Sequence, residues 1–170
     1  MDKSGKEVIG VIGAGTMGSG IAQVAAMAGH STLLFDSNSA ALKKAGDDIK
    51  KTFIRLVEKG KMSEAESMVI FNNISFVDST AKLSSCSFII EAIIESLEIK
   101  QSLFRELENI STDDCILASN TSSLSITSIA SACKKQTRVI GVHFFNPAPW
   151  RAVNPECAIR PWCAEAGNTR

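Results

Sequence analysis

A glycine-rich turn between a short apolar run and a helix-forming segment constrains the fold of this chain more than any other feature. Residues Val8–Ile12 (VIGVI) are the apolar run, and residues 13–18 (GAGTMG) match the pattern G-x-G-x-x-G. Residues 21–29 (IAQVAAMAG) are rich in helix formers and stop at a glycine. The order strand, glycine turn and helix predicts the first unit of a parallel sheet that binds a ligand at its carboxyl edge.

Each position of the turn has a physical task. Gly13 permits the tight turn, Gly15 lets the backbone approach a diphosphate, and Gly18 allows close packing of the helix on the strand. The helix N-terminus then offers free N–H groups to the phosphates. We therefore assign the dinucleotide site to the whole turn: Gly13, Ala14, Gly15, Thr16, Met17 and Gly18.

Asp36 follows a second expected strand, Ser31–Phe35, and stands 21 positions after Gly15. An acid at this place accepts hydrogen bonds from the ribose hydroxyls and repels a 2′-phosphate, so NAD is favoured over NADP. The alternative is a glycine-rich turn without a ligand. The joint occurrence of strand, turn, helix and acid favours the NAD site.

The rest of the chain alternates between strands and helices. Further strands are expected at Ile74–Val77, 87–90, 115–118 and 139–142, and further helices at 40–61, 63–70, Leu97–Ile110 and 125–132. Ser63 and Glu66 match a capping box at the start of the helix 63–70. This alternation predicts an α/β fold, a Rossmann-type doubly wound parallel sheet in a single domain over residues 1–149.

Four polar residues follow the ends of four expected strands. These are Asp36, Glu91, Asn120 and His143, and we expect them to converge on one crevice at the carboxyl edge of the sheet. Of the two histidines, His30 lies in a helix-to-strand turn and is expected at the surface. His143 is the candidate base, because an imidazole titrates near neutral pH and the hydroxyl-rich loop 119–124 (SNTSSL) could supply donors around a substrate oxygen.

Four motifs together carry a resemblance to a known family. They are residues 13–20 (GAGTMGSG), 91–95 (EAIIE), 119–124 (SNTSSL) and 143–149 (HFFNPAP). In this order they resemble the NAD-binding domain of 3-hydroxyacyl-CoA dehydrogenases, with the bacterial 3-hydroxybutyryl-CoA dehydrogenases as the nearest group. The resemblance implies NAD-dependent oxidation of (S)-3-hydroxyacyl-CoA to 3-oxoacyl-CoA, a step of fatty-acid β-oxidation.

The resemblance also implies roles for single residues. His143 would take the proton from the substrate 3-hydroxyl, Ser122 would hydrogen-bond the same oxygen, and Asn120 would orient the serine loop. Glu95, Lys100, Ser122 and Asn146 would contact the cofactor. Other roles stay open: Ser122 as a helix cap, Lys100 as a solvated helix charge, and Asn146 as a turn residue.

The lysine- and arginine-rich face of the helix 40–61 also has two interpretations. It is either a solvated surface or a contact for the phosphates of a CoA-type ligand.

The family pattern stops after Pro149. Family members have a glutamate that orients the histidine at the position of Pro155, and they continue into a helical domain that closes over the acyl chain. The sequence ends at Arg170 without that domain, so we expect a truncated member with an irregular tail over residues 150–170. The alternative function is therefore a catalytically weak or inactive NAD-binding module, with apolar surface exposed for self-association.

The composition of the chain restricts the classes of partner that we expect. The 18 basic and 18 acidic residues cancel, which argues against a nucleic-acid-binding surface. The five cysteines show no C-x-x-C pair, so we expect reduced thiols and no metal site. We see no signal peptide and no apolar run near the ~20 residues of a membrane span, so we expect a cytoplasmic protein.

Overall fold

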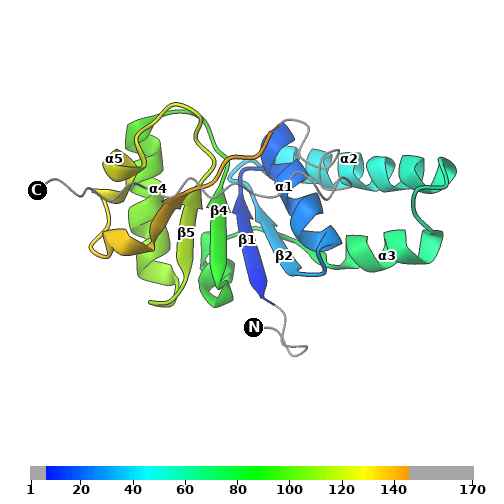
Figure 1. Ribbon diagram of the computed structural model, residues 1–170, viewed down its shortest axis with the longest axis horizontal. Coiled ribbons are helices and arrows are strands. Elements are labelled where there is room, and N and C mark those ends of the chain that lie inside the picture. The colour runs from blue at the N-terminus through cyan, green and yellow to red at the C-terminus, as the bar shows by residue number, and fades with distance from the viewer. Residues whose placement is uncertain (1–6, 146–170) are drawn as a thin grey trace, which may run out of the picture.

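The computed structural model describes residues 7–145 and shows a parallel sheet with helices on both faces (Figure 1). Within this part of the chain the strand order is β3-β2-β1-β4-β5-β6. The strands are β1 (Val8–Ile12), β2 (Ser31–Phe35), β3 (Ile74–Val77), β4 (Phe88–Glu91), β5 (Ile116–Ser119) and β6 (Val139–Gly141). The expected Rossmann-type α/β sheet is confirmed. The expected domain end at residue 149 and the tail 150–170 lie outside the described residues.

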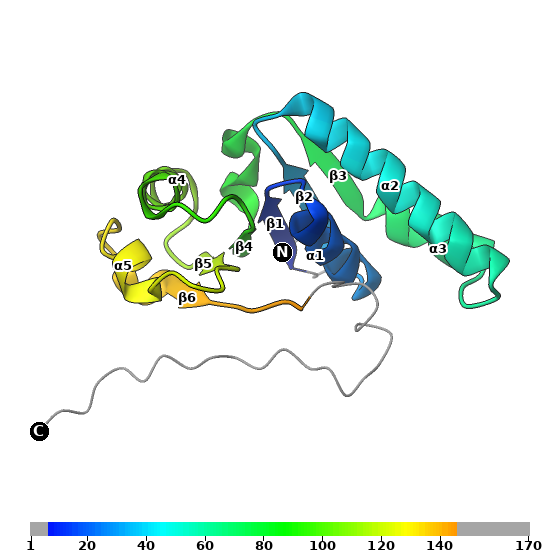
Figure 2. The same cartoon turned by 90° about the horizontal axis from the view of Figure 1, so that it is seen from above.

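The helices form two layers, as Figure 2 shows from above the carboxyl edge of the sheet. One face carries α1 (Thr16–Met27), α2 (Ser39–Glu58) and α3 (Glu64–Asn72). The other carries η1 (Thr80–Ser85), α4 (Leu97–Ile110) and α5 (Ile126–Ala130), and η2 (Gln136–Arg138) leads into β6.

The strand register brings the strand ends together at one edge of the sheet. Ile12 at the end of β1 lies opposite Phe35 of β2 on one side and Glu91 of β4 on the other. Glu91 in turn lies opposite Ser119 of β5. The loops that follow these strands therefore leave from the same edge, where parallel sheets place their ligands.

Alternation along each strand divides the core into two halves. In β4, Ile90 faces the α1–α3 layer and Ile89 faces the η1–α4–α5 layer, because successive side chains of a strand point to opposite faces. The largest fully buried apolar side chains are Phe53 of α2 on one face and Phe104 of α4 on the other. Each contributes about 2–3 kcal/mol by burial.

Several element boundaries differ from expectation. Helix α1 begins at Thr16, inside the glycine turn, because Gly15 itself is the N-cap. Helix α2 ends at Glu58 rather than 61, since Gly60 adopts a φ of +64°. The capping box of Ser63 and Glu66 is confirmed. The 3₁₀ helix η1 was not expected from the pattern of apolar residues.

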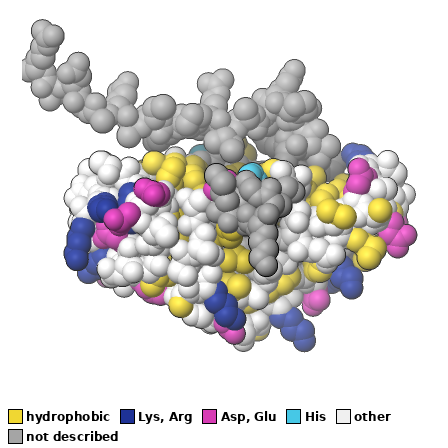
Figure 3. Space-filling model, turned by 90° about the horizontal axis from the view of Figure 1, so that it is seen from below, with side chains coloured by type: hydrophobic (Ala, Val, Ile, Leu, Met, Phe, Trp, Pro, Cys, Tyr) yellow, Lys and Arg dark blue, Asp and Glu magenta, His cyan; other side chains and the backbone are white. Residues whose placement is uncertain are grey.

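The surface mixes charges of both signs, and apolar side chains also reach it over the α2–α3 pair (Figure 3). Met68 and Val69 of α3 are among the most exposed apolar residues. His30 is half-buried rather than at the surface, and its Nδ1 atom is fully enclosed. Among residues 7–145, no helix is both long and apolar enough to cross a membrane.

Candidate cofactor and active site

The glycine turn is tightly packed at its two ends and open at Gly15. A Cβ atom on Gly18 would lie 1.7 Å from the carbonyl oxygen of Gly13, and one on Gly13 would lie 2.5 Å from that of Ala92. A Cβ on Gly15 would meet nothing within 4 Å. The chain itself therefore requires glycine at positions 13 and 18, whereas the absent side chain of Gly15 opens room for a ligand. No side chain in the described part of the chain caps α1, and its first turn holds no acid.

Asp36 organises the turn as well as facing the crevice. Its Oδ2 atom accepts the N–H of Ala14 at 2.7 Å, and its Oδ1 atom accepts the N–H of Asn38 at 2.8 Å. Each carboxylate oxygen can accept a second hydrogen bond. The expected bonds to ribose hydroxyls are therefore compatible with this geometry and stay a prediction.

A groove of about 600 Å³ extends from the turn toward η1 and α4. Its walls are made by Ile12, Gly13, Phe35, Asp36, Ser37, Asp78, Ser79, Thr80, Ile93, Ile99, Ser102, Leu103 and Glu106. The sequence pattern did not predict the wall of this groove that η1 and α4 form. The signal was present in α4, where the groove-lining positions 99, 102, 103 and 106 recur at helical spacing.

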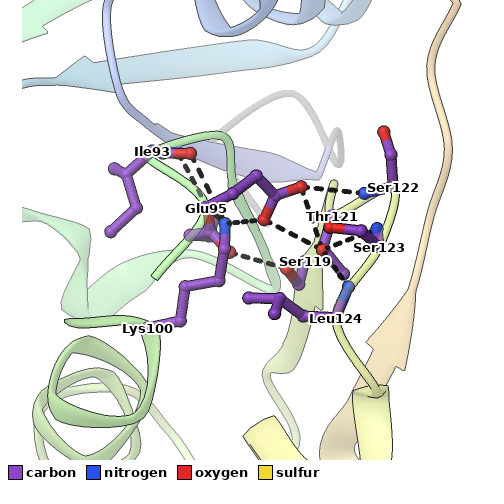
Figure 4. Close-up of polar contacts among 9 residues, drawn as sticks. Ile93, Glu95, Lys100, Ser119, Thr121, Ser122, Ser123 and Leu124 are labelled. Atoms are coloured by element: carbon purple, nitrogen blue, oxygen red, sulfur yellow. Dashed lines mark hydrogen bonds and ion pairs between the residues drawn. The ribbon is translucent and has the colours of Figure 1, made fainter. Parts of the chain in front are cut away.

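The serine loop after β5 is held by Glu95 (Figure 4). Both carboxylate oxygens of Glu95 lie 3.0 Å from Thr121 Oγ1, and Oε1 accepts the N–H of Ser122 at 2.9 Å. Partial burial raises the pKa of Glu95, but the hydrogen bonds from Ser122 and Thr121 and the charge of Lys100 outweigh it and lower the pKa. Glu95 is therefore an anion that fixes the loop at neutral pH.

The helix-cap interpretation of Ser122 is wrong. The N-cap of α5 is Ser125, whose side chain accepts the N–H of Ser128. Ser122 is exposed, and its hydroxyl makes no hydrogen bond to any other residue that the structure describes. That hydroxyl is available to a ligand.

The solvated-charge interpretation of Lys100 is also wrong, since its side chain is only 1% exposed. Its Nζ atom lies 2.5 Å from Glu91 Oε1 and 3.4 Å from Glu95 Oε2. The clue in the sequence was the helical spacing of Lys100, Phe104 and Leu107, which together form the buried face of α4.

The expectation that Glu91 lies in the crevice is wrong. It is the last residue of β4 rather than the first after it, and its side chain is fully buried. Glu91 therefore does not line the crevice with Asp36. Buried carboxylates need charged or hydrogen-bonding partners, and Lys100 and Ser119 supply them here.

His143 follows β6 on the same side of the sheet as the serine loop. Asn120 joins the two segments, because its Oδ1 atom accepts the N–H of Phe144 at 2.9 Å. The imidazole is exposed and contacts the ring of Phe145 edge-on, with 4.8 Å between ring centroids. His143 and Ser122 are not hydrogen-bonded to each other, although both lie in the described part of the chain. Asn146 lies outside the described residues.

Basic residues of α2 are partly neutralised along the helix itself. Lys44 and Lys51 pair with Asp48 at 2.8 and 3.8 Å, and all three side chains are exposed. These pairs favour a solvated surface, while a contact with CoA phosphates stays a prediction.

Comparisons with known proteins agree with this geometry. The family described as "3-hydroxyacyl-CoA dehydrogenase, NAD binding domain" matches residues 8–153. A 3-hydroxybutyryl-CoA dehydrogenase from Clostridioides difficile is 43% identical over 141 residues, which are 83% of this chain and 50% of the relative. The human mitochondrial hydroxyacyl-coenzyme A dehydrogenase is 42% identical, over 82% of this chain and 46% of its own length.

A solved structure shares the fold. The crystal structure of 3-hydroxybutyryl-CoA dehydrogenase from Escherichia coli K12 matches with a TM-score of 0.83 at 41% identity, covering 85% of this chain and 30% of that one. The chain thus spans about half the length, or less, of these relatives.

Proposed function

The chain belongs to the 3-hydroxyacyl-CoA dehydrogenase family through its NAD-binding domain, and from this we propose that it serves NAD-dependent oxidation of (S)-3-hydroxyacyl-CoA to 3-oxoacyl-CoA. The observation that carries the proposal is the meeting of three features at one sheet edge. They are the open glycine turn, the serine loop held by Glu95, and His143. The names of the bacterial relatives favour a short substrate of the 3-hydroxybutyryl-CoA type.

The strand order supports one direction for bound NAD. The diphosphate would sit at the N-terminus of α1, and the adenosine ribose at Asp36 on the β2 side. The nicotinamide half would then extend over β4 and β5, toward Glu95 and Ser122. Bound NAD would supply the chemistry by accepting hydride from the substrate C3 atom.

The chain's own residues would handle the proton and the substrate oxygen. His143 is exposed, so its imidazole can reach the 3-hydroxyl group and accept its proton. The Ser122 hydroxyl has no partner among residues 7–145, so it can hydrogen-bond the same oxygen. Asn120 keeps the two segments together through the N–H of Phe144. Asn146 completes the proposed cofactor contacts.

A second function is favoured by the open arrangement of the site. Because His143 and Ser122 are both exposed and are not hydrogen-bonded to each other, the described domain on its own could act as an NAD-binding module with little turnover. Self-association through exposed apolar side chains, a domain limit at residue 149 and a cytoplasmic location stay predictions.

The test follows NADH oxidation at 340 nm with acetoacetyl-CoA, together with NADH binding measured by fluorescence. The variant His143→Ala should abolish turnover and retain NADH binding. The matched control is His30→Gln, in the turn between α1 and β2 at the opposite sheet edge, which should keep both. A folded chain that binds NADH without turnover would support the module. A folded chain that does not bind NADH would refute both functions.

A further inference from the structure

A buried carboxylate beneath the proposed active site, that of Glu91, joins three segments of the chain. Both oxygens of Glu91 are used: Oε1 accepts the N–H of Ile93 at 2.7 Å and Lys100 Nζ at 2.5 Å, and Oε2 accepts Ser119 Oγ at 2.6 Å. Its main-chain oxygen accepts the N–H of Asn120 at 2.8 Å. One residue therefore fixes the loop after β4, the start of α4 and the end of β5.

These contacts continue to the surface of the site. Lys100 Nζ lies between the buried Glu91 and the half-exposed Glu95, whose carboxylate is 3.4 Å away and 41% exposed. Glu95 in turn holds Thr121 Oγ1 and the N–H of Ser122 (Figure 4). The order Glu91, Lys100, Glu95 alternates negative, positive and negative charge from the interior to the crevice.

We propose that Glu91 is a positioning residue for the nicotinamide half of the cofactor, acting through Lys100, Glu95 and the serine loop without touching the cofactor. The inference rests on the proposed function, which places the nicotinamide over β4 and β5. The adenosine half would lie on the far side of Gly13, where the N–H of Ile93 is the one Glu91 contact named above that belongs to the groove lined by Asp36. Glu91 should therefore influence the nicotinamide end of the dinucleotide more strongly than the adenosine end.

The charge of Glu91 is essential to this role. A buried ammonium ion must have a charged partner, and without the Glu91 carboxylate Lys100 would depend on Glu95 alone. Glu95 would then be drawn toward Lys100 and away from Thr121 and Ser122. A neutral glutamine at position 91 fills the same volume and can still accept one hydrogen bond, but it does not balance the charge of Lys100.

The experiment compares two ligands that differ only in the nicotinamide ring, which is present in NADH and absent from ADP-ribose. Their dissociation constants are measured on the full chain by fluorescence for NADH and by calorimetry for ADP-ribose. The variants are Glu91→Gln and Ser119→Ala; the second removes a single anchor of Glu91 and keeps every charge. The matched control is Glu108→Gln, a carboxylate of α4 that accepts two main-chain N–H groups, from Lys134 and Lys135, away from the site.

In the unsubstituted chain NADH should bind more tightly than ADP-ribose. Glu91→Gln should weaken NADH binding about tenfold, which corresponds to ~1.4 kcal/mol, and change ADP-ribose binding less than twofold. Ser119→Ala should raise the ratio of the NADH dissociation constant to the ADP-ribose dissociation constant about threefold. This variant tests the proposal on its own if Glu91→Gln does not fold. Glu108→Gln should lower stability and leave the ratio unchanged.

Three results would overturn the inference. One is an equal loss of affinity for both ligands in the Glu91 and Ser119 variants, which indicates a purely structural role. Another is a ratio of the two dissociation constants that is unchanged in both variants. The third is an unsubstituted chain that binds NADH no more tightly than ADP-ribose. If the unsubstituted chain binds neither ligand, the proposed function itself fails, which separates the two cases.

Discussion

Substitution of two glycines in the same turn should separate ligand binding from chain packing. Gly15 is open to solvent, with a φ of −70° and a ψ of −173° that alanine also adopts, and its Cβ would touch no protein atom. Gly15→Ala loses a favourable N-cap residue but restricts the unfolded chain, and both effects are about 0.5–1 kcal/mol with opposite sign. The free energy of unfolding should therefore stay within about 1 kcal/mol. NADH binding should weaken at least tenfold, about 1.4 kcal/mol, because the new methyl group occupies the approach of the diphosphate.

Gly18→Ala should show the reverse pattern. Alanine gains about 1 kcal/mol of helix propensity over glycine. Its Cβ, however, would stand 1.7 Å from the carbonyl oxygen of Gly13, a backbone atom that no rotamer change can move. Gly13 is itself confined by its φ of +101° and by Ala92, so the cost should reach the upper range for overpacking, about 3 kcal/mol. The net loss of about 2 kcal/mol corresponds to a fall in Tm of about 4–8 °C.

The assay is thermal unfolding followed by circular dichroism without cofactor, with NADH titration on the same preparations. Gly60→Ala is the control: a φ of +64° and open surroundings predict a loss of about 1 kcal/mol and normal NADH binding. The reasoning is refuted if Gly15→Ala unfolds as readily as Gly18→Ala, or if it binds NADH as tightly as the unsubstituted chain does.

Three further predictions concern other parts of the molecule. Asp36→Asn should narrow the preference for NADH over NADPH, and its unfolding free energy in urea should fall by about 1 kcal/mol, since one oxygen that accepts a main-chain N–H is lost. Arg138→Met should remove the bonds to Cys115 O and Ser111 Oγ and cost about 2 kcal/mol, without changing NADH affinity, because they lie at the opposite end of β5. Burial raises the pKa of Cys86 to about 12 and also raises that of the other two buried thiols. With residues 157 and 163 changed to serine, a disulfide reagent at pH 8 should label no thiol until urea unfolds the chain; rapid labelling of the folded chain would contradict this.

Much of the fold follows from local pattern. Strand β2 and helix α4 have the limits that hydrophobic periodicity predicts, because their apolar residues recur at the spacing of one face. The capping box at Ser63 is equally local, since its donor and acceptor are three residues apart. The position of Asp36 also follows from spacing, because a strand, a turn and a helix of given lengths return the chain to the same sheet edge.

Burial of charge could be inferred only in part from local pattern, since helical spacing puts Lys100 on the buried face of α4 but does not identify the partner of its charge. Glu91 and Lys100 are nine residues apart and look like ordinary surface residues, yet each is buried because the other neutralises it. The same holds for Glu95, whose role depends on Thr121 and Ser122 of a different loop. The first pair exists only after α4 folds back beside the end of β4, and the contacts of Glu95 exist only after β4 and β5 lie side by side.

The sequence by itself therefore determined the parallel α/β sheet, the glycine turn and the residues available for chemistry, because these depend on spacing along the chain. Only the tertiary structure decided which of them face the ligand. It placed Glu91 inside and Lys100 between two carboxylates, left the Ser122 hydroxyl exposed, and added the groove wall of η1 and α4. The physical reason is that burial, and with it the strength of every polar contact, depends on which segments pack together rather than on the order of residues.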